Sequence, residues 1–262
     1  MLESKLFLEV GVNHIGNINL ANDYLNFFLR SDYQNLTFMI HNQNFYDSMN
    51  KKKKNYLLPR KFYQKAITLA HKNKKKIGLS VCDIKSYNYI KDLNFDFYKL
   101  LGIAINNKEV IKVLRLKKKQ IYISLSQGDN IKINTCLKYF KSKKNLNLIY
   151  TYMSYNPEDL DLNRIGYIKS KFKLPVGYGN HYQGALPIYL SSFFNPSFYF
   201  IYLKHPKNKK ILFPDNKHAF FTTELNCDSV IFTFLDSLIL VFFIEVLKSL
   251  QATHDCVLLF LF

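Results

Sequence analysis

The sequence contains no tryptophan and little glycine or proline. Its 262 residues include 9 Gly and 7 Pro, which excludes collagen-like and proline-rich architectures. The 4 cysteines, Cys82, Cys136, Cys227 and Cys256, are too few for a dense disulfide framework and form no CxxC pair, so we interpret them as structural or incidental thiols in a reducing compartment rather than a zinc site. A hydrophobic content of 48% predicts one large globular domain or two small ones.

Acidic residues are also scarce. The sequence has 19 Asp and Glu but 37 Lys and Arg, which gives a formal net charge of +18. Such an excess is typical of proteins that bind nucleic acids, anionic membranes or anionic substrates. The basic runs at 51–54, 74–76 and 117–119 lie between apolar segments, as in solvated loops and helix ends. The sequence carries no nucleic-acid-binding motif, so we expect no nucleic-acid partner.

One long apolar run is present, at residues 230–247. It approaches the roughly 20 residues that span a bilayer, but Asp236 and Glu245 fall inside it and would each cost about 2.5 to 3.5 kcal/mol at a helix centre. We therefore favour a buried or disordered tail over a membrane anchor. Residues 1–12 contain Glu3 and Glu9 and do not resemble a signal peptide, so the predicted location is cytoplasmic.

Short apolar segments recur along residues 1–226, separated by segments with helical spacing such as 60–71, 107–116, 131–140 and 157–172. This alternation predicts an α/β fold with a parallel sheet buried on both faces. An open doubly wound sheet would show the same pattern, but polar groups follow the first, sixth, seventh and eighth segments, which favours a (β/α)8 TIM barrel. The eight predicted strands are 6–12, 36–40, 77–82, 97–101, 121–126, 148–153, 175–178 and 198–203.

Glu9 lies within the first apolar strand, and Asn13 and His14 follow it around a glycine-bearing turn. A carboxylate in such a strand is costly to bury unless it is paired, so Glu9 is either a working group or a structural salt-bridged one. Lys99 ends the fourth strand and is a candidate for holding a phosphate or carboxylate, or a surface lysine whose stem lies along the sheet.

Two histidines leave neighbouring strands, His181 after the seventh and His205 after the eighth. Adjacent strands are about 4.8 Å apart, so two imidazoles at matched positions can share a divalent metal. Either histidine alone is more often a hydrogen-bonded structural residue. Further on, residues 213–218 form a polar loop that can fold over the mouth of a barrel.

Taken in order, these segments resemble the N-acetylneuraminate (sialic acid) synthase family, which condenses phosphoenolpyruvate with an amino-sugar aldehyde. The opening EVGVNHIGNINLA is similar to the family's EIGVNHNGDxxxA, and PVGYGNH to its PVGYSDH. The resemblance extends through YK at 98–99, SYNPEDLDLNRI at 154–165, LKH at 203–205 and PDNKHA at 214–219.

The resemblance implies a (β/α)8 barrel, a role for each matched residue, and a family precedent for a homodimer. His181 and His205 are the implied ligands of Mn²⁺ or Mg²⁺, which acts as a Lewis acid. Glu9 and Asp215 are the implied catalytic residues that bind the sugar hydroxyls and assist proton movement. The implied substrate-binding residues are Asn13, Lys99, Ser154, Tyr155 and Lys217.

The sequence departs from the family at the phosphate-binding positions. Thr37 and Met39 replace a lysine and a glutamine, and Gly102 and Gly179 replace serines. Each lost hydrogen bond to a charged group removes about 1.5 to 3 kcal/mol. A degenerate, non-catalytic barrel that binds sugar or acts as a scaffold is therefore the alternative function.

The resemblance ends near Cys227, and residues 227–262 form the atypical apolar tail. The family's small C-terminal antifreeze-like domain, which closes the partner's active site in its dimers, has no counterpart in this segment. We interpret the tail as a frameshifted or truncated end.

Overall fold

The computed structural model describes residues 5–41, 56–126, 129–154, 159–206 and 213–225. Residues Met1–Thr222 form one compact unit. The predicted apolar tail and its boundary at residue 226 lie outside the described residues. Within the described residues, no helix is long and apolar enough to cross a membrane.

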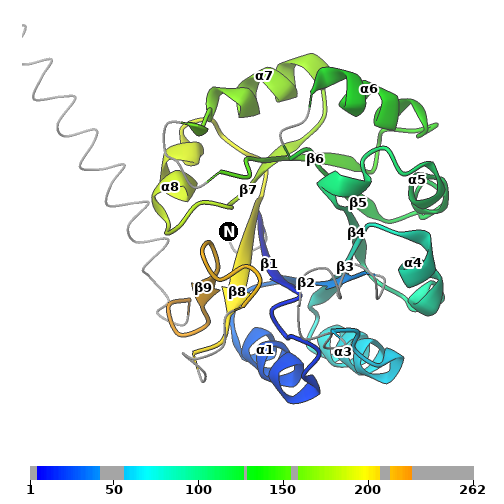
Figure 1. Cartoon of the computed structure of the whole chain (residues 1–262), viewed down its shortest axis with the longest axis vertical. Coiled ribbons are helices and arrows are strands. Elements are labelled where there is room, and N and C mark those ends of the chain that lie inside the picture. Colours follow the sequence, from blue (N-terminus) through cyan, green and yellow to red (C-terminus); the bar gives the residue numbers. More distant parts are fainter. Residues whose placement is uncertain (1–4, 42–55, 127–128, 155–158, 207–212, 226–262) are drawn as a thin grey trace, which may run out of the picture. The chain divides into compact units, whose positions relative to one another are not determined.

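Eight parallel strands follow one another in chain order around a closed barrel, because β1 pairs with both β2 and β8. Figure 1 shows these strands inside a ring of helices. Closure confirms the predicted (β/α)8 TIM barrel and excludes the open sheet. The strands are β1 (Leu6–Gly11), β2 (Asn35–Ile40), β3 (Lys76–Val81), β4 (Phe97–Leu100), β5 (Gln120–Ser124), β6 (Leu146–Thr151), β7 (Val176–Gly179) and β8 (Tyr199–Lys204).

The described helices lie in the connections between strands. They are α1 (Ile18–Arg30), α3 (Arg60–Lys72), α4 (Ile84–Ile90), α5 (Lys108–Leu114), α6 (Asn130–Lys138), α7 (Asn163–Phe172), α8 (Leu186–Ser192) and the 3₁₀ helix η2 (Gly102–Ala104). Four begin at a side chain that accepts hydrogen bonds from the first helical turn, which satisfies otherwise unpaired amides. These capping residues are Asn17, Asp83, Asn107 and Asp129.

The helix predicted over 157–172 begins later, at Asn163. Residues 157 and 158 lie outside the described residues. The hydroxyl of Ser154 donates a hydrogen bond to the carboxylate of Asp159 over 2.5 Å, and such local side-chain bonds compete with helical ones. Among the described residues just before Asn163, Leu160 and Asp161 have no regular structure and Leu162 is a turn, so α7 begins only at Asn163.

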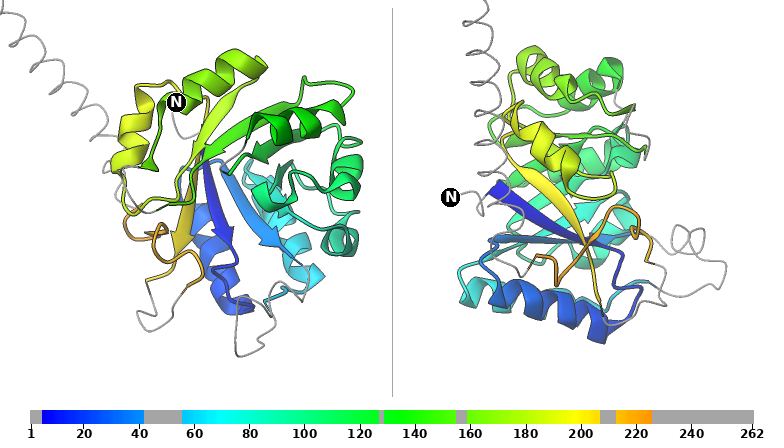
Figure 2. Two further views of the ribbon diagram at one scale, coloured as in Figure 1. Left: turned by 45° about the horizontal axis from the view of Figure 1, so that its top comes forward. Right: turned by 90° about the vertical axis from the view of Figure 1, so that its left-hand side faces the viewer.

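A short strand, β9 (Phe220–Phe221), pairs with β8 outside the eight-stranded ring. Leu203 and Lys204 are its register partners. The two views in Figure 2 show this segment (orange) beside β8 (yellow). The pairing returns the loop after β8 to the barrel, and this loop carries Asp215.

An unusually aromatic layer fills the barrel interior, where branched aliphatic residues are the rule. Phe7 stacks on Phe200 with a ring-centroid distance of 4.8 Å and meets Phe97 edge to face at 5.1 Å. The layer consists of Phe7, Phe97, Tyr122, Ile149, Phe198 and Phe200.

Two strand glycines make room for these rings. A Cβ atom at Gly78 would lie 2.0 Å from the ring of Phe97, and one at Gly177 would lie 2.2 Å from the ring of Phe198. The glycines are therefore required by packing against a neighbouring ring.

We predict that Gly78→Ala destabilises the barrel by about 1 to 3 kcal/mol, because the added methyl group overpacks the aromatic layer. The matched control is Gly166→Ala in α7, where no atom lies within 4 Å of the added Cβ, and where alanine is favoured over glycine by about 1 kcal/mol. Urea unfolding of both variants measures the difference. Equal stability of the two would contradict the packing role of Gly78.

Candidate functional site

A buried ion pair lies directly above the aromatic layer, toward the carboxyl ends of the strands. Inward-facing side chains recur every second residue along a strand, so Glu9 follows Phe7 on β1 and Lys99 follows Phe97 on β4. Lys99 Nζ donates to Glu9 Oε2 over 2.5 Å, and the two side chains are only 3% and 1% exposed. The pair rules out a surface position for Lys99 and shows how the buried carboxylate is compensated.

Polar side chains from three other strands surround this pair. Ser80 Oγ on β3 donates to Glu9 Oε1 over 2.9 Å and lies 3.2 Å from the hydroxyl of Thr37 on β2. Lys99 Nζ also donates to the Tyr202 hydroxyl over 3.4 Å and lies 4.6 Å from the ring centroid of Phe200. The charges are thus embedded in hydrogen bonds and aromatic faces.

Asp215 lies beside this pair, in the loop that follows β8. Loss of hydration on burial and the charge of Glu9 raise its pKa to about 7, although Lys99 opposes the shift. The carboxyl group of Asp215 can therefore hold or release a proton near neutral pH.

Asn13 positions the Asp215 loop. Its Nδ2 donates to the Leu203 carbonyl over 2.7 Å, and its Oδ1 accepts from the Asp215 amide over 3.1 Å. Gly11 adopts φ +56°, and a Cβ atom there would lie 2.8 Å from Asp215 Oδ2. The turn after β1 therefore fixes Asp215 through Asn13 and leaves room for it at Gly11.

His181 stacks on His218 rather than lying alone at the strand end. The ring centroids are 4.3 Å apart with an interplanar angle of 30°, and Tyr202 meets both rings edge to face. Burial, aided by the nearby charge of Lys99, lowers the pKa of His218 to about 4. Burial likewise holds the pKa of His181 well below its ordinary value, with His218 and Lys99 as further causes. Both rings are therefore neutral at pH 7 and can act as metal ligands or hydrogen-bonding groups.

His205, the predicted partner of His181, packs toward helix α1. Its Nε2 lies 4.0 Å from Asp23 Oδ2, and its ring meets Tyr24 edge to face at 5.9 Å. The contacts of the two histidines thus differ, since His181 meets Tyr202 and His218 whereas His205 meets Asp23 and Tyr24. A shared ion requires His205 to exchange its contact with Asp23 for the metal, and its role as a ligand stays a prediction.

The remaining predicted substrate residues are more peripheral. Ser154 is hydrogen-bonded to Asp159, Lys217 is exposed, and Tyr155 lies outside the described residues.

A cavity of about 530 Å³ opens at the ends of β5 and β6, with Ser126, Tyr150, Tyr152 and Arg164 in its wall. None of the predicted site residues that the structure describes lines this cavity.

At two positions where glycine replaces the family's serine, a hydroxyl group from a neighbouring segment occupies the space beside the glycine. A Cβ atom at Gly102 would lie 1.8 Å from Ser126 Oγ, and one at Gly179 would lie 2.5 Å from Thr151 Oγ1. Sequence reasoning missed both hydroxyls, as well as His218 and Tyr202. A glycine where a serine is expected, together with a serine or threonine at or just after the end of a neighbouring strand, is the signal that would have found the first two.

The sequence matches the NeuB family over residues 24–191. The chain belongs to the NeuB family. A comparison with curated proteins gave no match. NeuB-family membership supports a synthase-type enzyme of carbohydrate biosynthesis.

Solved structures share the fold of this NeuB-family chain. An N-acetylneuraminic acid synthetase from Leptospira borgpetersenii, in complex with citrate, is 20% identical with a TM-score of 0.75, covering 85% of this chain and 80% of the other. The spore coat polysaccharide biosynthesis protein E from Chromobacterium violaceum is 14% identical with a TM-score of 0.76, covering 90% and 76%. SpsE from Bacillus subtilis is 12% identical with a TM-score of 0.74, covering 89% and 68%.

We predict that Lys99→Met lowers the free energy of unfolding by about 3 to 5 kcal/mol, because it leaves the Glu9 carboxylate buried without its cation. The double variant Glu9→Gln/Lys99→Met should recover most of that loss. Lys132→Met serves as a control, since its pair with Asp129 is about half exposed and is expected to contribute at most about 1 kcal/mol. Denaturant unfolding at pH 7 measures these values. Additive losses in the double variant would contradict the pairing.

We predict that Asp215→Asn becomes more stable than the parent chain as pH rises. The folded parent retains a proton on Asp215 that the unfolded chain releases between pH 4 and 7, so this residue's contribution to stability is lost as pH rises through about 7. The difference in unfolding free energy should grow between pH 4 and 7 and then level off. A pH-independent difference would show that Asp215 titrates normally.

Proposed function

We propose that this NeuB-family chain condenses phosphoenolpyruvate with an N-acylated amino sugar to give a nonulosonic acid and phosphate, for surface glycan biosynthesis. N-acetylmannosamine and a related deoxy-diamino hexose are the candidate acceptors. The proposal rests on the grouping of four polar side chains inside the barrel. The barrel brings Glu9, Lys99, Asp215 and His181, which are far apart in sequence, into one connected polar cluster at the carboxyl ends of the strands.

Each group in the cluster has a role that its environment supports. Lys99 supplies the positive charge for an anionic substrate, and Ser126 and Thr151 place hydroxyls where the family has serines. Glu9 and Asp215 bind the sugar hydroxyls. Because its pKa is about 7, Asp215 can give a proton to the aldehyde oxygen and recover it later in the cycle.

The proposed reaction forms one carbon–carbon bond and breaks one carbon–oxygen bond. Carbon 3 of the enol ester attacks the aldehyde carbon, and Asp215 protonates the resulting alkoxide. Water then adds to the cationic carbon 2 and gives up a proton to Glu9 or solvent. The tetrahedral intermediate loses phosphate by cleavage of the bond between carbon 2 and oxygen while its new hydroxyl gives a proton to Asp215, which leaves a ketone at carbon 2 and restores the protonated acid.

The proposed metal fits the environment of His181. Its buried Nδ1 has no hydrogen-bond partner among the described residues, and the neutral ring can donate an electron pair. With His205 as second ligand, a bound Mn²⁺ or Mg²⁺ would polarise the sugar aldehyde. His218, stacked on His181, would hold that ring in place.

A non-catalytic sugar-binding or scaffolding barrel is the second candidate. It is favoured by Thr37, Met39, Gly102 and Gly179, which replace polar phosphate-binding residues of the family. It is also favoured by the Glu9–Lys99 contact, which leaves Lys99 only 3% exposed. Such a protein would bind metal and amino sugar without turnover.

We predict phosphate release and equimolar nonulosonic acid when the chain is incubated with phosphoenolpyruvate, N-acetylmannosamine or the diamino hexose, and Mn²⁺ or Mg²⁺. Asp215→Asn should lower kcat by about 10² to 10⁴-fold, as expected for loss of a general acid–base group. Asp32→Asn is the matched control, because Asp32 is exposed and lies between α1 and β2, at the amino ends of the strands and opposite the proposed site. Failure to release phosphate with every acceptor would support the second candidate.

A further inference from the structure

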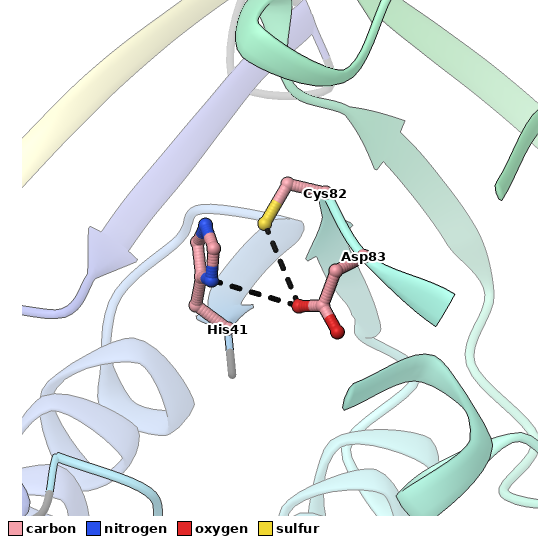
Figure 3. A group of neighbouring side chains, drawn as sticks. All are labelled: His41, Cys82 and Asp83. Atoms are coloured by element: carbon pink, nitrogen blue, oxygen red, sulfur yellow. Dashed lines mark hydrogen bonds and ion pairs between the residues drawn. The ribbon is translucent and has the colours of Figure 1, made fainter. Parts of the chain in front are cut away.

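A second cluster of metal-ligating side chains lies at the ends of β2 and β3. His41 directly follows β2, and Cys82 and Asp83 directly follow β3. The two strands pair in parallel, with Ile40 opposite Val81, so their carboxyl ends meet at one edge of the sheet. Figure 3 shows the imidazole of His41 and the thiol of Cys82 both facing one carboxylate oxygen of Asp83.

The spacing of these ligand atoms is close to that of a tetrahedral metal site. His41 Nδ1 lies 3.6 Å from Asp83 Oδ2, Cys82 Sγ lies 3.9 Å from the same oxygen, and the three ligand atoms all lie within 4.8 Å of one another. Around tetrahedral Zn²⁺ the corresponding separations are about 3.3 Å and 3.5 Å, given metal–ligand bonds of about 2.0 to 2.3 Å. The first two separations come within a few tenths of an ångström of bonding geometry, and binding an ion also requires the imidazole and the thiol to lie well inside the 4.8 Å bound.

The cluster is shielded from solvent and held in place by neighbouring groups. The side chains of His41 and Asp83 are 9% and 16% exposed, and Cys82 is buried. Asp83 accepts hydrogen bonds from the amide of Ser86 at 2.9 Å and from its hydroxyl at 2.6 Å. Outer contacts of this kind orient a ligating carboxylate and are part of a metal site.

We propose that His41, Cys82 and Asp83 bind a Zn²⁺ ion, or Co²⁺ in its place. A thiolate, an imidazole and a carboxylate are ligands that Zn²⁺ accepts, whereas a thiolate is a poor ligand for Mg²⁺ and Mn²⁺. Three protein ligands leave a fourth position for water or a substrate oxygen. The ion joins the ends of the two strands that carry Thr37 and Ser80, and so fixes the strands that contact Glu9. The site is separate from the metal proposed at His181 and does not depend on the proposed function.

Titration of the chelator-treated full chain with Co²⁺ tests the site. One equivalent should produce the near-ultraviolet charge-transfer band of a thiolate–Co²⁺ bond together with intense visible bands of tetrahedral Co²⁺, and Zn²⁺ should remove both. Cys82→Ser should abolish the charge-transfer band. Cys136→Ser, which removes another buried thiol, and the double variant Cys227→Ser/Cys256→Ser should retain it.

A second variant protects the test against misfolding of Cys82→Ser. Asp83→Asn preserves the helix cap and should weaken Zn²⁺ binding at least about tenfold by isothermal titration. His181→Ala should retain the Co²⁺ band whether or not the chain is a synthase. Absence of the band in the parent chain, its survival in Cys82→Ser, or its loss in His181→Ala would each overturn the proposed site.

Discussion

The ion pair between Glu9 and Lys99 is the interaction on which the interior of this barrel depends. Two charges in a site almost closed to water are tolerated only when each is satisfied by the other and by hydrogen bonds. Ser80 and Tyr202 supply those bonds, and the aromatic layer below excludes water from one side. Glycines at 78 and 177 allow the rings of that layer to fit. Packing and electrostatics are therefore parts of one arrangement.

The same pair also changes the pKa values of titratable groups at the carboxyl ends of the strands. Glu9 raises the pKa of Asp215, while Lys99 opposes that shift and lowers the pKa of His181 and His218. Removing either member of the pair would consequently change the protonation of groups that it does not touch directly. A change at Glu9 or Lys99 must be interpreted through the whole cluster, because these charges act together in a region of low dielectric constant.

Much of the fold could be predicted from the sequence, because each strand is a short apolar run that must be buried on both faces. The carboxylate at Glu9 and the cation at Lys99 were visible as charges inside such runs, although the sequence left open whether Lys99 lies inside the barrel or along its surface. Their direct contact could not be predicted, since it depends on the tilt and stagger that closure imposes on β1 and β4.

Side-chain direction beyond the strand ends was the less predictable part. His205 was paired with His181 from matched positions, yet the structure places it beside Asp23 and Tyr24 of α1. The stacking of His181 on His218 depends on how the loop after β8 folds back. Cys82 was interpreted as an incidental thiol because no second cysteine lies nearby in sequence. Its neighbour His41 follows another strand and lies 41 positions earlier in the sequence.

The contacts of Asn13 have a consequence for how the chain folds. This side chain, next to the first strand, binds Leu203 and Asp215 across sequence separations of 190 and 202 residues. Contacts of such long range form late, because the entropy of closing the intervening loop must first be overcome. The cluster around Asp215 can thus be assembled only when β8 docks against β1. A partly folded chain could hold six or seven strands in register and still lack its acid–base centre.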